Sequence, residues 1–405
     1  MPLDENHFLR KRWYSVPADP GEGAQTDPFV YPWPVVCENP TIQPVYYCFR
    51  DERSAKNLQN VVNEAIKNWG HAMSVSALTF ELDPRAKDNP YMPCSQLGGD
   101  DMDMLVISDE SLDDPDLNKV KKHFNSGACG TSTTVGYTYK PKVSFRHHLK
   151  FCHLAPWMAD KDTPYAIKAM THELGTSDPI TMDIIITDFV LRVGHALGLQ
   201  HEHQRPDREK YLYVRFKYID GYEEMEELAK EDPNNYFDVE EDEDEIPQAE
   251  RVKAVLRDDI YLREYFPNAL DFLAGHRMDT PEAKEKWQDY EFSQKFDFES
   301  IMMYSGDSGR NDYATKRNKY TITDHDNKPV WMGGAQGTKD YSVSEGDIAR
   351  VAMLYDAHTD ECEKAKKGEV WGKAGTAPRS LKVKIRDIFE GVVHAPLAVR
   401  KRDEI

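Results

Sequence analysis

The chain of 405 residues lacks the features of several large protein classes. No apolar run reaches the ~18–20 residues that a membrane-spanning helix needs, and IIITDFVLRV (184–193) is interrupted by Asp188 and Arg192. The net charge of -20 disfavours a nucleic acid or an anionic membrane as partner, because phosphate groups bind basic surfaces. The opening MPLDENHFLRKRWYSV has no apolar stretch typical of a signal peptide. Read literally, the sequence predicts a soluble, cytoplasmic protein without a membrane span.

Cysteine is scarce as well. The chain has six cysteines and no C-x-x-C pair. Cysteines this sparse in a long chain are as compatible with buried thiols as with disulfides. The six are Cys37, Cys48, Cys94, Cys129, Cys152 and Cys362.

The rest of the composition is that of a globular protein, with 40% hydrophobic and 11% aromatic residues. Residues 1–32 are polar and contain much Pro, Gly and Asp, which predicts a loose leader or pro-segment. Residues 363–405 turn basic and are expected to form a tail outside the core. One domain is therefore expected over residues 33–362.

Strand and helix patterns alternate in the first part of this domain. PVYYCF (44–49) predicts a strand, and residues 54–69 carry apolar side chains at helical spacing, with Ser54 as the expected N-cap and Gly70 as the stop. Further strands are predicted over four more apolar stretches, residues 77–82, 102–108, 133–139 and 142–151. This order predicts an α+β fold in which a helix packs against a mixed sheet.

Residues 222–258 differ from this pattern because they are strongly acidic, with an unbroken run from Glu240 to Glu245. They are interpreted as a solvated, partly disordered insertion. A calcium site is the alternative, although the glycine of an EF-hand loop is absent.

The stretch GHALGLQHEHQRPDR, Gly194–Arg208, points to metal chemistry. His195, Gly198 and His201 have the spacing of the second half of a zinc-protease signature, in which the glycine permits a sharp turn between two ligands. In its first half, a His and a Glu stand four and three residues before the second His. The His shares a helix face with that residue, and the Glu deprotonates a water molecule. Those two positions hold Leu191 and Arg192, which can do neither.

The missing half is found upstream. His172-Glu173-Leu174-Gly175 is half a signature, and removal of the 19 residues Thr176–Gly194 would join it to His195. The joined sequence, THELGHALGLQHEHQRPDR, is a complete H-E-x-x-H-x-x-G-x-x-H-E. Three interpretations are open: a retained intron or other gene-model error, a true insertion, or a genuine replacement by Leu191 and Arg192 with THEL as a coincidence.

The joined motif resembles the signature of the astacin family of metzincin zinc endopeptidases. FDFESIMMYS (296–305) resembles the family's Met-turn, and SVSEGDIARVAMLYDAHTDEC (342–362) resembles its closing helix and final cysteine. CGTSTTVGY (129–137) and KVSFRHHLKFC (142–152) lie where the family has an edge strand and two cysteines. The resemblance covers roughly residues 33–362 and implies a metzincin-like fold, with a mixed twisted sheet, an active-site helix and a mostly irregular or helical C-terminal subdomain.

The resemblance also implies roles for individual residues. His172, His195 and His201 are the implied Zn²⁺ ligands and Glu173 the general base. Met302 is implied to lie beneath the metal, and Tyr304 to be a phenolic ligand or oxyanion donor. Glu202 is implied to pair with the processed N-terminus as a latency switch, the alternative being an ordinary surface carboxylate. The implied activity is hydrolysis of internal peptide bonds of proteins or peptides.

A pseudo-protease that keeps the scaffold and binds protein partners, or binds zinc weakly, is the alternative function. By resemblance the protein is secreted, Cys129 pairs with Cys152, and Cys362 pairs with Cys37, Cys48 or Cys94. The departures from the family are the 19-residue block, the acidic stretch and the missing leader. The cleavage specificity and the oligomeric state have no signal in the sequence.

Overall fold

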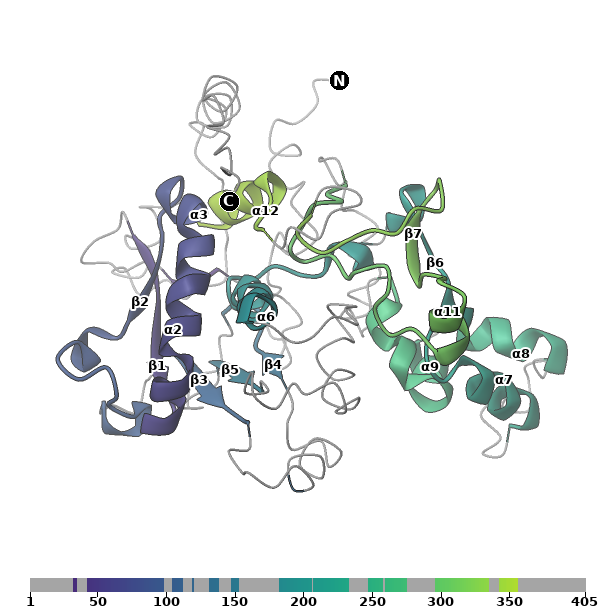
Figure 1. Ribbon diagram of the computed structural model, residues 1–405, viewed down its shortest axis with the longest axis horizontal. Helices are drawn as coiled ribbons and strands as arrows, with labels where there is room; N and C mark the ends of the chain where they lie inside the picture. Colours follow the sequence, from purple (N-terminus) through teal and green to yellow (C-terminus); the bar gives the residue numbers. More distant parts are fainter. Residues whose placement is uncertain are drawn as a thin grey trace, which may run out of the picture.

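The computed structural model describes twelve stretches of the chain. They are residues 32–34, 42–97, 104–111, 119, 131–137, 147–152, 182–205, 207–232, 247–257, 259–274, 296–334 and 342–355. A sheet with its helices forms one lobe, a smaller sheet with several short helices forms the other, and helix α6 lies between them (Figure 1).

The first lobe begins with strand β1 (Gln43–Phe49) and helix α2 (Glu52–Asn68), close to the predicted bounds. The expected N-cap is wrong by three positions, because Asp51 caps α2 by accepting a hydrogen bond from the Ser54 backbone N–H. The helix ends one residue before Trp69, and the short helix α3 (Gly70–Ser74) follows directly.

The main sheet has five strands in the order β2-β1-β3-β5-β4. The other strands are β2 (Leu78–Leu82), β3 (Leu105–Asp109), β4 (Ser132–Thr133) and β5 (His147–Phe151). All neighbours pair in parallel except β4 and β5, so the predicted mixed sheet and the α+β class are confirmed. The strand expected at 133–139 is wrong for Val135–Tyr137, because the pairing with β5 stops at Thr133.

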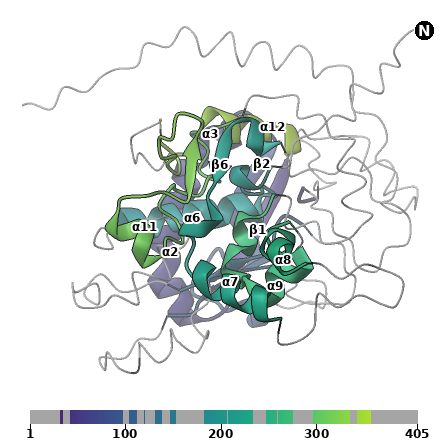
Figure 2. The ribbon, with the colours of Figure 1, turned by 90° about the vertical axis from the view of Figure 1, so that its right-hand side faces the viewer.

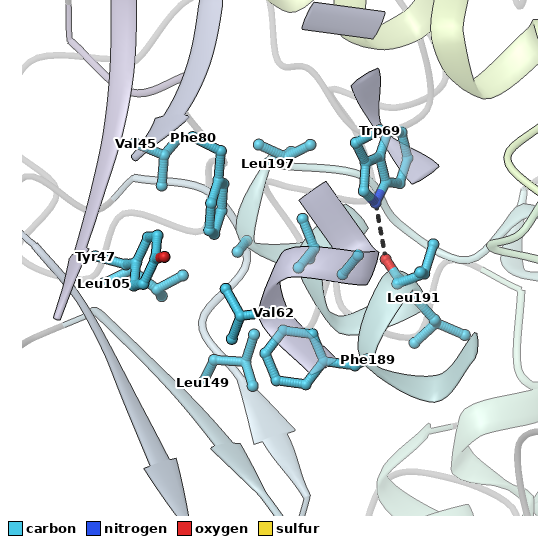
Figure 3. Packing of buried hydrophobic residues seen from close by; sticks show 14 of the residues in the cluster. Val45, Tyr47, Val62, Trp69, Phe80, Leu105, Leu149, Phe189, Leu191 and Leu197 are labelled. Atoms are coloured by element: carbon cyan, nitrogen blue, oxygen red, sulfur yellow. Dashed lines mark hydrogen bonds between the residues drawn. The ribbon is translucent and has the colours of Figure 1, made fainter. Parts of the chain in front are cut away.

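The core of this lobe lies between α2 and α6 (Met182–Ala196) and against the sheet. Phe189 and Leu191 of α6 are fully buried, and the Trp69 indole N–H donates to the Val190 carbonyl at 3.0 Å (Figure 3). Residues 182–194 are thus helical, and Ile185, Phe189, Val190, Leu191 and Val193 contribute to the core. The end of the 19-residue block therefore packs as an ordinary core helix.

The second lobe has its own apolar core. Its described helices are α7 (Tyr222–Glu231), α8 (Gln248–Val255), α9 (Asp259–Tyr265) and α11 (Asp312–Lys316) (Figure 2). Strand β6 (Leu212–Val214) pairs antiparallel with β7 (Ile322–Asp324). The interpretation of 222–258 as a solvated insertion is wrong at both ends, where Met225, Ala229 and Val255 are buried. The acidic run Glu240–Glu245 lies outside the described residues.

Helix α12 (Glu345–Leu354) is the predicted closing helix. It begins with a capping box in which Ser344 and Asp347 bond each other's backbone N–H. Among the described residues, no helix is long and apolar enough to cross a membrane.

A disulfide joins Cys48 to Cys94, with sulfur atoms 2.01 Å apart. The pairing of Cys362 with either of these residues is therefore wrong. Cys152 is also disulfide-bonded. Its predicted partner Cys129, together with Cys37 and Cys362, lies outside the described residues.

Candidate active site

The C-terminal end of α6 turns sharply to bring its two histidines together. The Leu199 N–H donates to the Gly194 carbonyl and the Gly198 N–H to that of His195, at 2.9 and 2.8 Å. Gly198 has a φ of +104°, a left-handed conformation that strains residues with a Cβ. This local turn returns the chain so that His201 faces His195, as the motif predicted.

Two distant side chains stabilise the end of the helix. The Trp33 indole N–H donates to the Ala196 carbonyl at 2.8 Å, and the Tyr355 hydroxyl donates to that of Leu197 at 3.0 Å. Burial raises the pKa of Tyr355, so its phenol keeps the proton that it donates. Carbonyls at the end of a helix have no partner inside the helix, so these bonds fix the last turn of α6.

His195 and His201 are arranged as two metal ligands. The His195 Nδ1 lies 2.9 Å from the Leu199 carbonyl, and the His201 Nδ1 lies 3.1 Å from that of Met302. Carbonyls only accept, so each Nδ1 carries a proton, and in the neutral form of each ring Nε2 presents the lone pair that a metal would take. These Nε2 atoms are 3.2 Å apart, close to the edge of about 3.3 Å that Zn–N bonds of ~2.0–2.1 Å form in a tetrahedron. The donor pair fits zinc.

The third ligand is not supplied by α6. One turn before His195 is Leu191, which has no donor atom, and Arg192 occupies the position of the general base. Arg192 pairs within the helix with Asp188 at 3.3 Å, and a guanidinium cannot accept a proton. No group of three or more His, Cys, Asp or Glu placed to hold a metal occurs within the described stretches. His172 and Glu173 lie outside them.

Met302 and Tyr304 lie next to this histidine pair. The Met302 carbonyl accepts from both the His201 ring and the Glu202 N–H, the latter at 3.0 Å. A Cβ added at Gly194 would lie 2.5 Å from the Met302 sulfur and 3.1 Å from Trp69, so a side chain at this position would require the methionine to shift. The Tyr304 ring is buried, with its centroid 4.6 Å from that of His201.

His203 is part of the site and was missed by the sequence analysis. Its Nε2 lies 2.8 Å from the Asp271 carbonyl, its Nδ1 accepts from the Tyr304 N–H at 3.3 Å, and its ring centroid is 4.2 Å from that of Tyr304. Burial, followed by the neighbouring His201, lowers the pKa of His203 well below its usual range. The ring is therefore a neutral support for the backbone of Tyr304. Its position two residues after His201 was the available signal.

Glu202 is not a surface carboxylate. It is buried and forms ion pairs with Arg205 at 2.9 Å and Arg350 at 2.7 Å. The Asp297 N–H donates to the same Glu202 oxygen as Arg205, at 2.9 Å. The expectation of an ordinary surface carboxylate is therefore wrong, because Arg350 of α12 supplies a buried cation. This long-range partner has no signature in the motif. The pairing of Glu202 with a processed N-terminus stays a prediction, since residues 1–31 lie outside the described residues.

Residues 181–244 match the sequence model of the astacin family of peptidases. The match includes the whole of Gly194–Arg208 and excludes His172 and Glu173. A search of curated proteins found no significant match.

Two solved structures are similar at low identity. One is high choriolytic enzyme 1, a hatching enzyme zinc-protease from the medaka fish Oryzias latipes, at 15% identity and a TM-score of 0.37, covering 81% of this chain and 95% of the enzyme. The other is myroilysin, at 12% identity and a TM-score of 0.33, covering 80% of this chain and 95% of that one. TM-scores this low do not establish a shared fold on their own. The motif around the two histidines and the match over residues 181–244 make this part of the chain similar to the peptidases of the astacin family.

Proposed function

We propose that this protein is a zinc-dependent endopeptidase whose active form lacks the block Thr176–Gly194. His172, His195 and His201 are the proposed zinc ligands, Glu173 the general base, and Tyr304 the oxyanion donor. The observation that carries the proposal is the pair of Nε2 atoms 3.2 Å apart, each on a ring whose Nδ1 faces a carbonyl.

The protein groups would divide the work of peptide hydrolysis. Zinc held by the three histidines would supply Lewis acidity. Glu173 would take a proton from the water as its oxygen forms the new C–O bond, and would pass this proton to the amine nitrogen when the tetrahedral intermediate collapses and the C–N bond breaks. Tyr304 would donate a hydrogen bond to the oxygen of the tetrahedral intermediate.

The position of Gly194 supports the removal of the block. Joining Gly175 to His195 puts a glycine at the place of Gly194, where a Cβ would lie 2.5 Å from the Met302 sulfur. The same join puts His172 at the position of Leu191 and Glu173 at that of Arg192 on the helix face. This one deletion therefore keeps a glycine beside Met302 and also restores an imidazole and a carboxylate at the two motif positions of the helix.

A pseudo-protease is the second candidate function for the chain with the block present. Leu191 and Arg192 occupy the helix turn before His195, and their side chains are buried. Leu191 has no donor atom, and Arg192, which is paired with Asp188, cannot accept a proton from water, so neither replaces the missing ligand and base. We expect the full 405-residue chain to bind zinc weakly and to hydrolyse casein poorly or not at all.

The experiment compares three proteins: the full chain, the chain without Thr176–Gly194, and that deletion variant with Glu173→Gln. The deletion should give one tightly bound zinc and hydrolysis of casein, and Glu173→Gln should remove hydrolysis while keeping the zinc, because Gln cannot accept the proton. Equal proteolysis by the full chain and the deletion variant would show that the block is a tolerated loop.

The transcript gives an independent test of the block. We expect the mature message to lack the codons for Thr176–Gly194, or an equivalent block shifted by one residue, because Gly175 and Gly194 are interchangeable at the join. Sequencing across the codons for Met170 to Leu197 decides the question. A message that carries the block in every clone would contradict the proposal.

We further propose that the protein works in an oxidising, extracellular compartment on protein substrates. The Cys48–Cys94 disulfide and the disulfide at Cys152 support this, since such bonds are rare in the cytosol. Cys129 is the proposed partner of Cys152, and Cys37 the partner of Cys362. Thiol titration of the native protein should find no free thiol, and six free thiols would rule the proposal out.

A further inference from the structure

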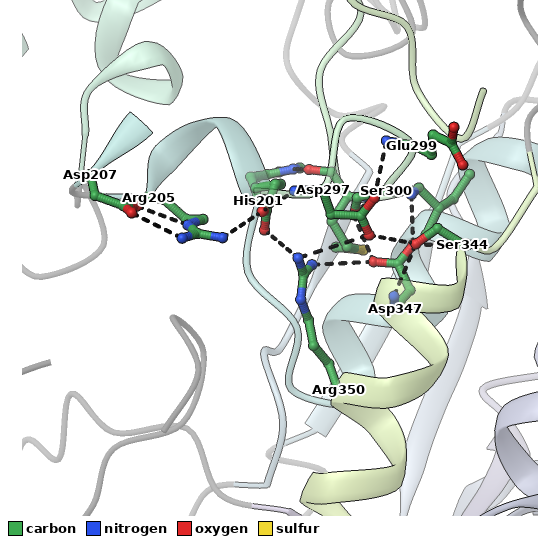
Figure 4. A network of polar contacts seen from close by, with 12 residues as sticks. His201, Arg205, Asp207, Asp297, Glu299, Ser300, Ser344, Asp347 and Arg350 are labelled. Atoms are coloured by element: carbon green, nitrogen blue, oxygen red, sulfur yellow. Dashed lines mark hydrogen bonds and ion pairs between the residues drawn. The ribbon is translucent and has the colours of Figure 1, made fainter. Parts of the chain in front are cut away.

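Buried charges surround the loop that carries His201. Five charged side chains from three separate parts of the chain meet behind the histidine (Figure 4). They are Glu202, Arg205, Asp297, Asp347 and Arg350. Taking charges out of water is costly, and replacing a buried ion pair by apolar residues is often neutral or stabilising. The cluster is therefore better explained by the geometry that it imposes than by stability.

The cluster is coupled to His201 through one carbonyl group. The Met302 carbonyl accepts from the His201 Nδ1 at 3.1 Å and from the Glu202 backbone N–H at 3.0 Å. The Glu202 side chain extends away from the histidine into the charge cluster, where both of its oxygens are bonded. A shift of the Glu202 carboxylate would therefore move the backbone that sets the orientation of the His201 ring.

Arg350 links this loop to the C-terminal helix. Its guanidinium contacts Glu202 at 2.7 Å, Asp347 at 3.3 Å and Asp297 at 3.9 Å. The side chain is buried, and although burial by itself would favour the neutral form, the three carboxylates raise the pKa of Arg350 above its usual value. A planar guanidinium with five N–H donors can serve several carboxylates in fixed directions, which an ammonium group cannot do.

We propose that Arg350 is a positioning residue for His201, acting through Glu202. The guanidinium holds the Glu202 carboxylate, the Glu202 backbone N–H holds the Met302 carbonyl, and that carbonyl orients the imidazole. The value of this position for catalysis rests on the proposed function, but the coupling of α12 to His201 does not.

The test compares Arg350→Met and Arg350→Lys with Leu354→Ala, a control that removes a buried side chain of the same helix from the apolar core. Amide hydrogen exchange is measured on metal-free full-length protein at matched global stability. Arg350→Met should speed exchange of the Glu202 amide by about tenfold or more, and Arg350→Lys should have an intermediate effect. Leu354→Ala should leave this amide within about twofold of the wild type.

A second pair of variants tests whether the effect of Arg350→Met depends on the Glu202 side chain. In protein that already carries Glu202→Met, adding Arg350→Met should change the exchange of residue 202 by less than about twofold, because the side chain at 202 no longer accepts a hydrogen bond from Arg350. An equal effect of Arg350→Met in both backgrounds, or an effect matched by Leu354→Ala, would overturn the proposal.

Zinc affinity provides the functional readout, measured by competition with a chelator. Arg350→Met should weaken zinc binding by about 10–100-fold, the range typical of residues that orient a ligand, and Leu354→Ala should not. This readout uses the chain without Thr176–Gly194, and failure of that chain to bind zinc would count against the proposed function alone, since the exchange experiment needs no metal. Zinc binding that is unchanged in Arg350→Met would count against the positioning role.

Discussion

The two stretches of chain that meet at Gly194 differ in what holds them in place. Upstream, residues 185–193 are held by apolar packing against α2, with one internal ion pair. Downstream, residues 195–205 are held by directed hydrogen bonds and ion pairs from distant segments, among them Trp33, Tyr355, Met302 and Arg350. At the two motif positions upstream, Leu191 and Arg192 offer no ligand or base, whereas the downstream stretch presents two imidazoles.

The contrast separates the requirements of folding from those of chemistry. A buried helix turn is satisfied by apolar side chains of suitable volume, so many sequences can fill the place of residues 185–193. The downstream stretch needs particular donors and acceptors at fixed distances, because a buried polar group without a partner is costly. The fold therefore tolerates the loss of the first half of the motif, and the metal site does not.

The largest effect is expected from giving α6 the missing side chains. In the full chain, Leu191→His with Arg192→Glu would create a second imidazole one turn before His195 and a carboxylate beside it. A third ligand should strengthen zinc binding on the order of 100-fold, roughly one ligand's share of the ~10–16 kcal/mol of a structural zinc site. Isothermal titration measures the affinity, and a casein assay should detect hydrolysis.

The control for this variant is Leu191→His alone, which should bind zinc but lack the base and remain inactive. If the double variant folds and binds zinc no better than the wild type, residues 191 and 195 do not share a face as the helix implies.

The arrangement of the site downstream of Gly194 could be predicted from the sequence. The spacing of His195, Gly198 and His201 predicted their arrangement, because a helix end and a glycine turn are local structures. The hydrophobic pattern likewise predicted β1 and α2, which each bury one continuous face. Local patterns of this kind are readable in one sequence.

The features that the sequence did not predict depend on contacts between distant segments of the chain. An apolar run such as IIITDFVLRV has the composition of a buried helix, so composition alone did not show whether residues 184–193 belong to the core. The pairing of Glu202 with Arg350 joins residues far apart in the chain, and the type of neither residue predicts which partner it will take. The N-cap of α2 was misplaced because Asp51 and Ser54 are both good caps and bond each other.

A smaller effect should confirm that the upstream turn serves the core. Leu191 is fully buried, so Leu191→Ala should lower the free energy of unfolding by about 2–5 kcal/mol. Leu228→Ala removes a side chain that is 37% exposed and should change it by less than about 0.5 kcal/mol. Urea denaturation measures both. Similar small losses in the two variants would mean that α6 is not packed as described.

The point where the two stretches meet can be tested by a substitution of Gly194. An alanine Cβ there would lie 2.5 Å from the Met302 sulfur and 3.1 Å from Trp69, so Gly194→Ala should cost roughly 1–3 kcal/mol of stability through overpacking. The matched control is Gly70→Ala, where a Cβ meets nothing within 4 Å. Thermal unfolding distinguishes them. A Gly194→Ala protein as stable as its control would remove the steric argument for a glycine at the join.

The smallest effect concerns the pH dependence of the downstream stretch. Asp347 is fully buried and accepts from the Ser300 hydroxyl at 2.6 Å and the Ile301 N–H at 2.8 Å. Burial, with the nearby charge of Asp297, raises its pKa from 3.8 to about 6, although Arg350 opposes the shift. The folded state thus holds this proton more tightly than the unfolded state, and the contribution of Asp347 to stability falls as the pH rises from about 4 to about 6 and is constant above that.

Asp347→Asn keeps the shape of the protonated acid and cannot titrate. Its stability relative to the wild type should therefore increase across this interval, as measured by urea denaturation at several pH values. Asp326→Asn, at an exposed turn, should show no such trend. A relative stability of Asp347→Asn that decreases as the pH rises would show that Arg350 and the hydrogen bonds outweigh burial, and that the carboxylate is ionised throughout.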